Sequence, residues 1–357
     1  MYITAINHCI PYKNNCGDTI TGYFKNSFPA EADNDIFVKS SAVSFSSNTS
    51  AGRPLKKLLN ITCPYYGVKM ISGAEMFRLE QRLNNCPTIG TVVKVLSNYT
   101  DYMQKIEKKM FEKFSECAKI SPEKTLPEFL QELYDDSIIK LKLEEFSVLD
   151  DADALSKELS PQTAFAIRKK ITRCREVILK NNQQDTFKRK TLISSLDDIK
   201  PKPEEEIFFE KIKDKALYLP TSGSSENAFV VKYASRSHQE IAKRILRASV
   251  ATIEHIKPES LGGENKLSNF MLASSSANSY RSNLPLVKYI EKFPKIPENC
   301  QRYINEIIYS IYAKRLKGCD MYPYQVKKTL AVESDGKIEL DLSQYKPRSC
   351  RTYLRNV

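Results

Sequence analysis

The sequence predicts an α+β fold, in which a mostly helical chain contains one small ββα unit. Apolar residues recur three or four positions apart over most of residues 74–217, which is the spacing of amphipathic helices. Two short apolar runs rich in β-forming residues follow near residues 252 and 270, with two adjacent glycines between them. A cluster of serines at 274–276 then supplies a cap for a further helix.

Composition limits the classes of protein that this chain can be. It has 357 residues, of which 41% are hydrophobic, so it can bury a core without disulfides or a metal. Its 55 basic residues exceed its 43 acidic residues, and the net charge of +12 favours a polyanionic partner, foremost nucleic acid. No run of about 18 uncharged apolar residues occurs, which argues against a membrane partner. Nine cysteines without a CxxC pair indicate reduced thiols and a cytoplasmic protein.

The amino-terminal part differs from the rest of the chain. Residues 1–53 are rich in Asn, Ser and Thr and lack periodic apolar positions, so we expect an irregular segment, whether mobile or not. Such a composition also occurs in signals for specialised secretion. Secretion from the cell therefore stays open as an alternative to a cytoplasmic location. Residues 54–73 are predicted to form a short strand and a turn.

Residues 74–236 are predicted to be a helical region. Helical spacing occurs in four segments, which are Glu75–Leu83, Val92–Phe114, Leu126–Leu149 and Pro161–Lys180. In the last of them one apolar stripe follows the Ser160-Pro161 start signal, and it consists of Ala164, Ile167, Ile171, Cys174 and Ile178. Residues 132–158 carry nine acids and three bases, whereas residues 168–190 carry nine bases and two acids. The basic run is either a solvated face or a surface that follows phosphates.

Residues 237–290 contain the ββα unit, and residues 291–357 form a C-terminal region. Ser237 and Glu240 are spaced as a capping box that opens a helix, with His238 expected at the surface. The first strand covers residues 252–256 and stops before Pro258, and the second strand lies near 270–272. The C-terminal region is predicted to contain an amphipathic helix over 301–316, a strand over 337–342 and a basic tail.

Four polar residues of the ββα unit suit chemistry on phosphate. Glu254 and His255 are adjacent, and Asn269 and Asn278 follow them. A carboxylate oxygen and an amide oxygen are hard ligands that suit Mg²⁺, and an imidazole can take a proton from water near neutral pH. Neighbours on an ideal strand point to opposite faces, so Glu254 and His255 can share one site only if the strand ends or bends there.

This stretch resembles the HNH, or ββα-metal, endonuclease family. The resemblance covers about 40 residues and is carried by Glu254-His255-Ile256, Pro258, Ser260, Gly262-Gly263, Asn269 and Asn278. It implies that His255 is the general base and that Glu254 and Asn278 hold one Mg²⁺ (or Mn²⁺). It also implies that Asn269 ties the loop and orients the base, and that Arg281 lies near the scissile phosphate.

Two features depart from the family pattern. Many members bind zinc through two cysteine pairs, but here these positions read Cys63-Pro64-Tyr65-Tyr66-Gly67 and Ser274-Ser275-Ser276-Ala277, so no structural zinc is expected. If these segments still meet, residues 60–72 pack on residues 270–278, and the helical region is an insertion within one nuclease unit. The second departure is glutamate at 254 instead of aspartate or histidine, which moves the carboxylate by about a bond length.

The resulting hypothesis is a metal-dependent endonuclease that cuts nucleic acid, DNA rather than RNA. Affinity for nucleic acid is expected to come from three groups of basic residues. They are the 168–190 run, the residues before the motif (Lys243, Arg244 and Arg247) and the tail (Lys346, Arg348, Arg351 and Arg355). Two alternatives stay open, which are a catalytically degenerate HNH fold that only binds nucleic acid or protein, and a delivered nuclease toxin. The sequence does not determine the oligomeric state.

Overall fold

Helices form most of the chain, and the described strands form one small antiparallel sheet. The structure is a computed structural model that describes residues 52–58, 60–180 and 185–347. All of these residues lie in the compact unit Asp35–Val357. The predicted α+β class is confirmed, whereas the prediction for residues 1–53 falls almost wholly outside the described residues. Within the described ranges, no helix is both long enough and apolar enough to cross a membrane.

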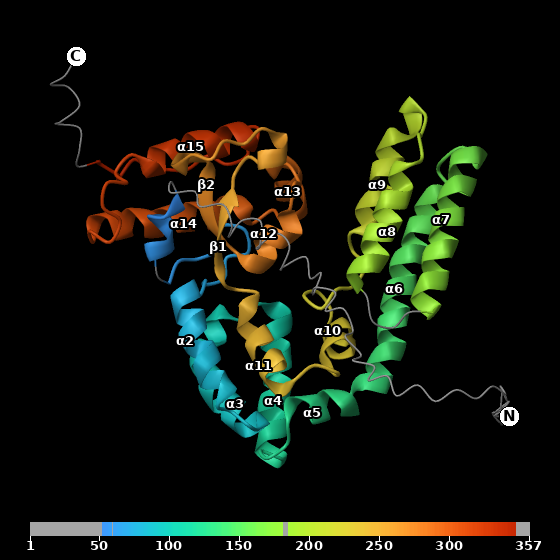
Figure 1. Cartoon of the computed structure of the whole chain (residues 1–357). Coiled ribbons are helices and arrows are strands. Elements are labelled where there is room, and N and C mark those ends of the chain that lie inside the picture. Colours follow the sequence, from blue (N-terminus) through green and yellow to red (C-terminus); the bar gives the residue numbers. More distant parts are fainter. Residues whose placement is uncertain (1–51, 59, 181–184, 348–357) are drawn as a thin grey trace, which may run out of the picture. The chain divides into compact units, whose positions relative to one another are not determined.

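The predicted strand, loop, strand and helix are all present (Figure 1). Strand β1 (Ala251–His255) pairs antiparallel with strand β2 (Phe270–Ser274). Helix α12 (Ser275–Arg281) follows β2 directly. The Ser274 hydroxyl accepts a hydrogen bond from the Ala277 amide and so caps this helix, as the serine cluster predicts.

The segment before the first long helix packs on this ββα unit. A backbone hydrogen bond from the Cys63 amide to the Val68 carbonyl, 2.7 Å long, closes a tight turn. Gly67 has a φ of 69°, the left-handed conformation that this turn needs and that other residues rarely adopt. The Ser274 amide donates to the Cys63 thiol at 3.3 Å. The turn at 63–67 thus lies against the residue that caps α12, as expected if these two segments meet.

The strand predicted within residues 54–73 is wrong. This segment contains a short 3₁₀ helix (Leu55–Lys57) and two isolated bridges, one of which links Ile71 to Val250 just before β1. Because the segment pairs with other backbone only through isolated bridges, packing of its side chains holds it in place. Its apolar side chains enter the same core as the ββα unit.

This first core also contains the C-terminal helices α13 (Leu286–Lys292), α14 (Ile296–Tyr312) and α15 (Tyr322–Glu333). Tyr65 is fully buried in it and meets Tyr289 edge to face, with ring centroids 5.1 Å apart. Aromatic packing thus joins the turn at 63–67 to helix α13.

A second core lies among helices from both ends of the helical region. These helices are α2 (Gly73–Asn84), α3 (Ile89–Leu96), α4 (Lys105–Ile120), α5 (Leu126–Glu132), α10 (Glu226–Tyr233) and α11 (His238–Arg247). The capping box of α11 is confirmed, because the Ser237 hydroxyl accepts from the Glu240 amide and the Glu240 carboxylate accepts from the Ser237 amide. His238 is not at the surface as predicted. It is 8% exposed, and its Nδ1 accepts a hydrogen bond from the Leu126 amide at 3.0 Å.

Two of the predicted helices are split. The segment 92–114 divides into α3 and α4 because residues 97–102 form a 3₁₀ turn. The Ser97 hydroxyl donates there to the Lys94 carbonyl, and such side-chain bonds compete with the helical ladder. The segment 126–149 divides at Leu133 into α5 and α6 (Tyr134–Ser156). Apolar spacing is helical on both sides of each break, so periodicity alone does not reveal it.

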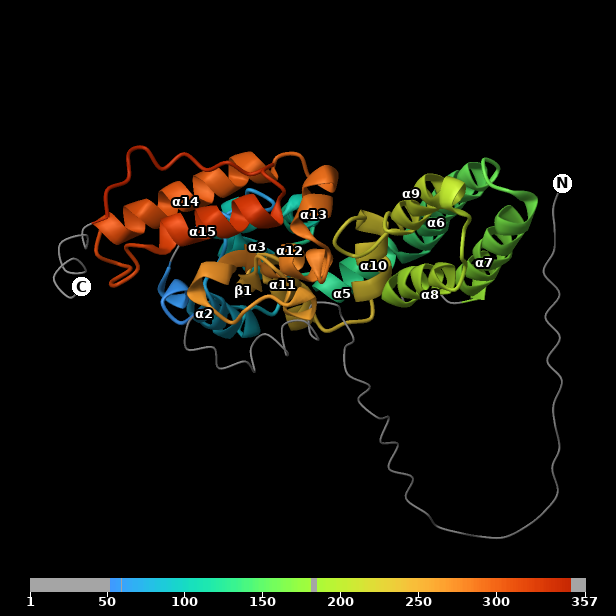
Figure 2. The same ribbon diagram turned by 90° about the horizontal axis from the view of Figure 1, so that it is seen from above.

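A third core lies among four helices, which Figure 2 shows beside one another: α6, α7 (Pro161–Lys180), α8 (Asp185–Asp197) and α9 (Glu206–Ala216). The apolar stripe predicted on residues 161–180 is buried here, as expected, and α7 has the predicted bounds.

The acidic and basic stretches of this region face each other. Arg168 on α7 lies 3.1 Å from Asp153 on α6. The buried ammonium of Lys188 on α8 lies 2.9 Å from the Glu145 carboxylate on α6. Part of the basic run therefore pairs with acids of α6, and the buried Lys188 is not available to a phosphate.

Residues 337–342 alternate like a strand but do not form one. Ile338, Leu340 and Leu342 are buried, and Glu339 and Asp341 are exposed. No strand pairs with this segment among the described residues. The segment instead packs its three buried apolar side chains against the first core. The helix predicted over 301–316 corresponds to α14, and the tail from residue 348 lies outside the described residues.

Candidate active site

His255 is the last residue of β1 and lies half-buried at the end of the sheet. Its ring meets Phe270, the residue opposite it on β2, edge to face with centroids 4.7 Å apart. Its Nε2 lies 2.8 Å from Oδ1 of Asn265 in the loop between the strands. These two contacts hold the imidazole in one orientation.

Asn265 is a site residue that the sequence analysis missed. Its amide nitrogen faces the Glu259 carboxylate at 3.4 Å, which directs its Oδ1 towards His255. An amide oxygen only accepts, so in the neutral imidazole this hydrogen bond places the proton on Nε2 and leaves the lone pair on Nδ1. The imidazole is thus set up to take a proton at Nδ1. The sequence signal was a polar residue just after the glycine turn, which does not indicate a partner ten positions earlier.

Asn269 closes the loop that contains Asn265. Its side chain is buried, and its Oδ1 accepts from the Lys257 amide at 2.8 Å. Its Nδ2 donates to the carbonyls of Lys257 at 3.1 Å and of Glu264 at 3.0 Å. This geometry agrees with the predicted role of tying the loop. The contact with the base comes from Asn265 instead.

Glu254 lies on the other face of β1 and is buried. Its carboxylate accepts from Nη1 of Arg281 on α12 and forms an ion pair with it. Arg281 is 1% exposed, and its guanidinium also donates to the carbonyls of His255 at 2.6 Å and Ile256 at 2.5 Å and to the Tyr65 hydroxyl at 3.1 Å. The guanidinium therefore ties the end of β1 to α12 and to the segment before α2.

This arrangement corrects two predictions. Strand β1 keeps its regular pairing through His255, so Glu254 and His255 point to opposite faces rather than into one site. Arg281 does not lie exposed where a phosphate could bind it. A buried carboxylate needs a counter-charge, and Arg281 supplies it from α12.

Burial also changes the acidity of Glu254. Loss of hydration raises the pKa of its carboxyl from the ordinary 4.5 to about 7, against the opposing effect of Arg281 and of the Tyr65 hydroxyl. Between these two values the folded protein holds a proton at Glu254 that the unfolded chain has released. The contribution of Glu254 to stability is therefore largest at low pH and falls as pH rises through this window.

We expect the wild type to lose stability relative to Glu254→Gln as pH rises from 4.5 to 7. Glutamine keeps the shape of the protonated acid but cannot ionise. The slope should approach about 1.4 kcal/mol per pH unit, the linkage value for one proton. Urea unfolding of both proteins at intervals of pH measures it. A wild type that gains on the variant over this range would show that the pair with Arg281 outweighs burial.

Asn278 lies on α12 beside β1. Its Nδ2 donates to the Thr252 hydroxyl at 3.0 Å and to the Ile253 carbonyl at 3.2 Å. Within the described ranges its Oδ1 has no hydrogen-bond partner. Asn278 is thus oriented by the strand and keeps one acceptor oxygen available.

The predicted ligand pair does not fit a metal ion in this arrangement. Asn278 offers an oxygen, but the Glu254 carboxylate is bound by Arg281 and by the Tyr65 hydroxyl. Separating a buried carboxylate from the counter-charge that Arg281 supplies costs about 3–5 kcal/mol. In the part of the chain that the structure describes, no three His, Cys, Asp or Glu side chains are grouped so that they could hold a metal.

The predicted nucleic-acid contacts on α11 have different environments. Lys243 is half-buried, and Arg247 is exposed and lies 3.2 Å from Glu80. Arg244 is buried, 2.6 Å from the Glu107 carboxylate, so its assignment to a docking surface is wrong. The reason is helical geometry, which turns Arg244 to the apolar face of α11 while Lys243 and Arg247 lie towards the edge.

No protein-family model matches this chain, and comparisons with curated proteins and with solved structures find no match either. The resemblance to HNH endonucleases therefore depends on the residues of the ββα unit and their spacing.

Proposed function

We propose that this chain is an endonuclease of the HNH kind that cuts phosphodiester bonds, of DNA rather than RNA, with His255 as general base. The observation that carries the proposal is the imidazole at the end of β1, whose Nδ1 is left available because Nε2 is bonded to Asn265. Asn269 supports it by closing the surrounding loop. The net charge of +12 favours a polyanionic substrate.

The reaction follows from the assigned tautomer. Nδ1 of His255 takes a proton from water, the water oxygen bonds to phosphorus, and the bond from phosphorus to the 3′ oxygen breaks. The leaving oxygen then takes a proton from solvent. The Mg²⁺ (or Mn²⁺) ion predicted from the sequence has no part in this step, because Glu254 is paired with Arg281.

We expect the purified full-length chain to nick supercoiled plasmid, to cut RNA more slowly, and to lose affinity steeply as salt rises. Gel assays of both substrates over a salt series, with Mg²⁺, Mn²⁺ or EDTA, measure this. Cutting that persists in EDTA agrees with the ion pair described above. Cutting that EDTA stops would require Glu254 to exchange Arg281 for a metal. The absence of cutting in every condition would contradict the proposal.

One observation favours the alternative of a catalytically degenerate binding module. The Glu254–Arg281 pair gives the ββα unit an internal structural role that needs no reaction. Under this alternative, plasmid and RNA bind in the same assay and neither is cut.

We place the activity in the cytoplasm. The cysteines within the described ranges are free thiols, as expected in a reducing compartment, and they are Cys63, Cys86, Cys117, Cys174, Cys300 and Cys319. The alternative of a delivered toxin depends on residues 1–53, nearly all of which lie outside the described residues.

A further inference from the structure

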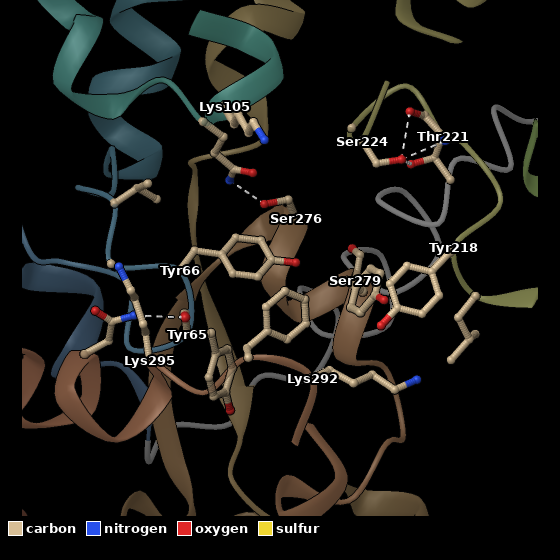
Figure 3. A pocket seen from close by; sticks show the side chains of 18 of the residues that line it. Tyr65, Tyr66, Lys105, Tyr218, Thr221, Ser224, Ser276, Ser279, Lys292 and Lys295 are labelled. Atoms are coloured by element: carbon tan, nitrogen blue, oxygen red, sulfur yellow. Dashed lines mark hydrogen bonds between the residues drawn. The ribbon is translucent and has the colours of Figure 1, made fainter. Parts of the chain in front are cut away.

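A cavity of about 910 Å³ lies among segments that the sequence analysis did not connect. It is lined by the turn at 65–68, the start of α4, part of α8, the loop 217–224 and residues of 276–302 (Figure 3). Its lining does not include His255, Asn265 or Asn278. Cavities of roughly 300–1,000 Å³ bind small organic molecules and cofactors in other proteins.

The charge of this cavity is strongly one-sided. One acid, Glu298, lines it together with six bases, which are Lys105, Arg189, Lys232, Lys292, Lys295 and Arg302. Lys292 pairs with Asp214 at 2.8 Å, and Arg302 pairs with Glu298 at 3.2 Å. Lys105 and Lys295 are exposed, and among the described residues neither ammonium forms an ion pair. The cavity thus has positive charge available for an anion.

Aromatic rings form a second part of the lining. Tyr66 and Tyr280 both pack on Phe293, each with ring centroids 5.5 Å apart. Tyr218 comes from the loop after α9 and is 60% exposed. Figure 3 shows Tyr66 and Tyr218 at the same cavity from different segments, with Ser279 beside Tyr218. An exposed ring at a cavity wall offers a face on which a planar base can stack.

Hydroxyl groups complete the lining. Thr221 and Ser224 lie in one turn, which is held because the Ser224 hydroxyl accepts from the Thr221 amide at 2.9 Å. Ser276 and Ser279 face the cavity from α12. Hydroxyls of this kind bind phosphate and sugar oxygens.

We propose that this cavity binds a nucleoside phosphate, either as a free nucleotide or as the phosphorylated end of a strand. Lys105 and Lys295 hold the phosphate, and Tyr218 stacks on the base. Ammonium groups alone would bind any anion, and exposed rings alone would bind any planar group. A nucleotide combines an anionic phosphate with a planar base, and this cavity offers both kinds of partner. The inference does not depend on His255, because the two sites share no lining residue.

The test uses the full-length chain and isothermal titration with four probes: AMP, ATP, inorganic phosphate and a 5′-phosphorylated single-stranded oligonucleotide. We expect a nucleotide or the oligonucleotide to bind more tightly than phosphate. Lys105→Ala/Lys295→Ala and Tyr218→Ala should each weaken that binding by about tenfold or more. All three side chains are exposed, so these variants should fold. Lys328→Ala and Tyr309→Ala replace exposed residues outside the cavity and serve as controls.

The probes separate the two sources of the ligand. Tighter binding of AMP or ATP identifies a free nucleotide, and tighter binding of the oligonucleotide that the cavity variants weaken identifies a strand end. The proposal is overturned if phosphate binds as tightly as every nucleotide probe, if no probe binds, or if the cavity variants bind like their controls. His255→Ala should bind all probes like the wild type, so a failed nuclease assay does not decide this result.

Discussion

The His255→Ala variant should cut DNA about 10²–10⁴-fold more slowly than the wild type, which is the usual contribution of a positioned general base. Its affinity for DNA should stay unchanged, because His255 is held by Asn265 and Phe270 and carries no part of the basic surface. Single-turnover cleavage measures the first effect, and anisotropy of labelled DNA measures the second. The two readouts together separate a lost base from a lost binding site.

Lys266→Ala is the matched control for this experiment. Lys266 lies in the same loop, and its exposed ammonium pairs with Glu264 at 2.8 Å. We expect this variant to keep the cleavage rate, with at most a small loss of affinity at low salt. A His255→Ala protein that cuts like the wild type would remove His255 from the mechanism. One that no longer binds DNA would show that the residue positions the loop instead.

The Arg281→Ala variant should lose about 3–5 kcal/mol of unfolding free energy, measured at pH 8, where Glu254 carries its charge. The loss has two physical causes. The Glu254 carboxylate stays buried without its counter-charge, and the carbonyls of His255 and Ile256 lose their donor. Urea or thermal unfolding measures the change, which for a unit of this size shifts the midpoint by about 10 °C.

Arg78→Ala is the control for Arg281→Ala. Arg78 pairs with Glu75 on the exposed face of α2, and such pairs contribute about 0–1 kcal/mol. The double variant Glu254→Gln/Arg281→Met should be less destabilised than the sum of its single changes, because no buried charge is then left alone. Equal, small losses for Arg281→Ala and Arg78→Ala would contradict the role given to the guanidinium at the end of β1.

The ββα unit could be predicted because its signals are local. Each of its elements begins and ends at residues within a few positions, such as Pro258 after β1 and Ser274 before α12. The docking of the turn at Cys63 was also foreseen, although the two segments are about 210 residues apart. The family resemblance predicted this contact, because the local spacing of residues says nothing about a partner so far along the chain.

The errors arose where spacing was correct but the partner was unknown. Residues 337–342 alternate as a strand does, yet they lie on a core without a neighbouring strand. The apolar spacing of residues 92–114 is helical on both sides of a break at 97–102, where the backbone forms a 3₁₀ turn, because apolar spacing does not record whether the helix is continuous. The spacing of apolar residues thus predicts which face of a segment is buried, but it does not predict the element against which that face packs.

The sequence by itself determined the fold class, the ββα order and the place of His255 in the first strand, because turn residues, caps and alternation act over short distances. Tertiary structure alone decided which charge lies beside which. It placed Arg281 on Glu254, Asn265 on His255, and the basic residues of α7 and α8 on the acids of α6. A charged side chain reaches its partner through space, so the sequence names the charges and only the packed chain pairs them.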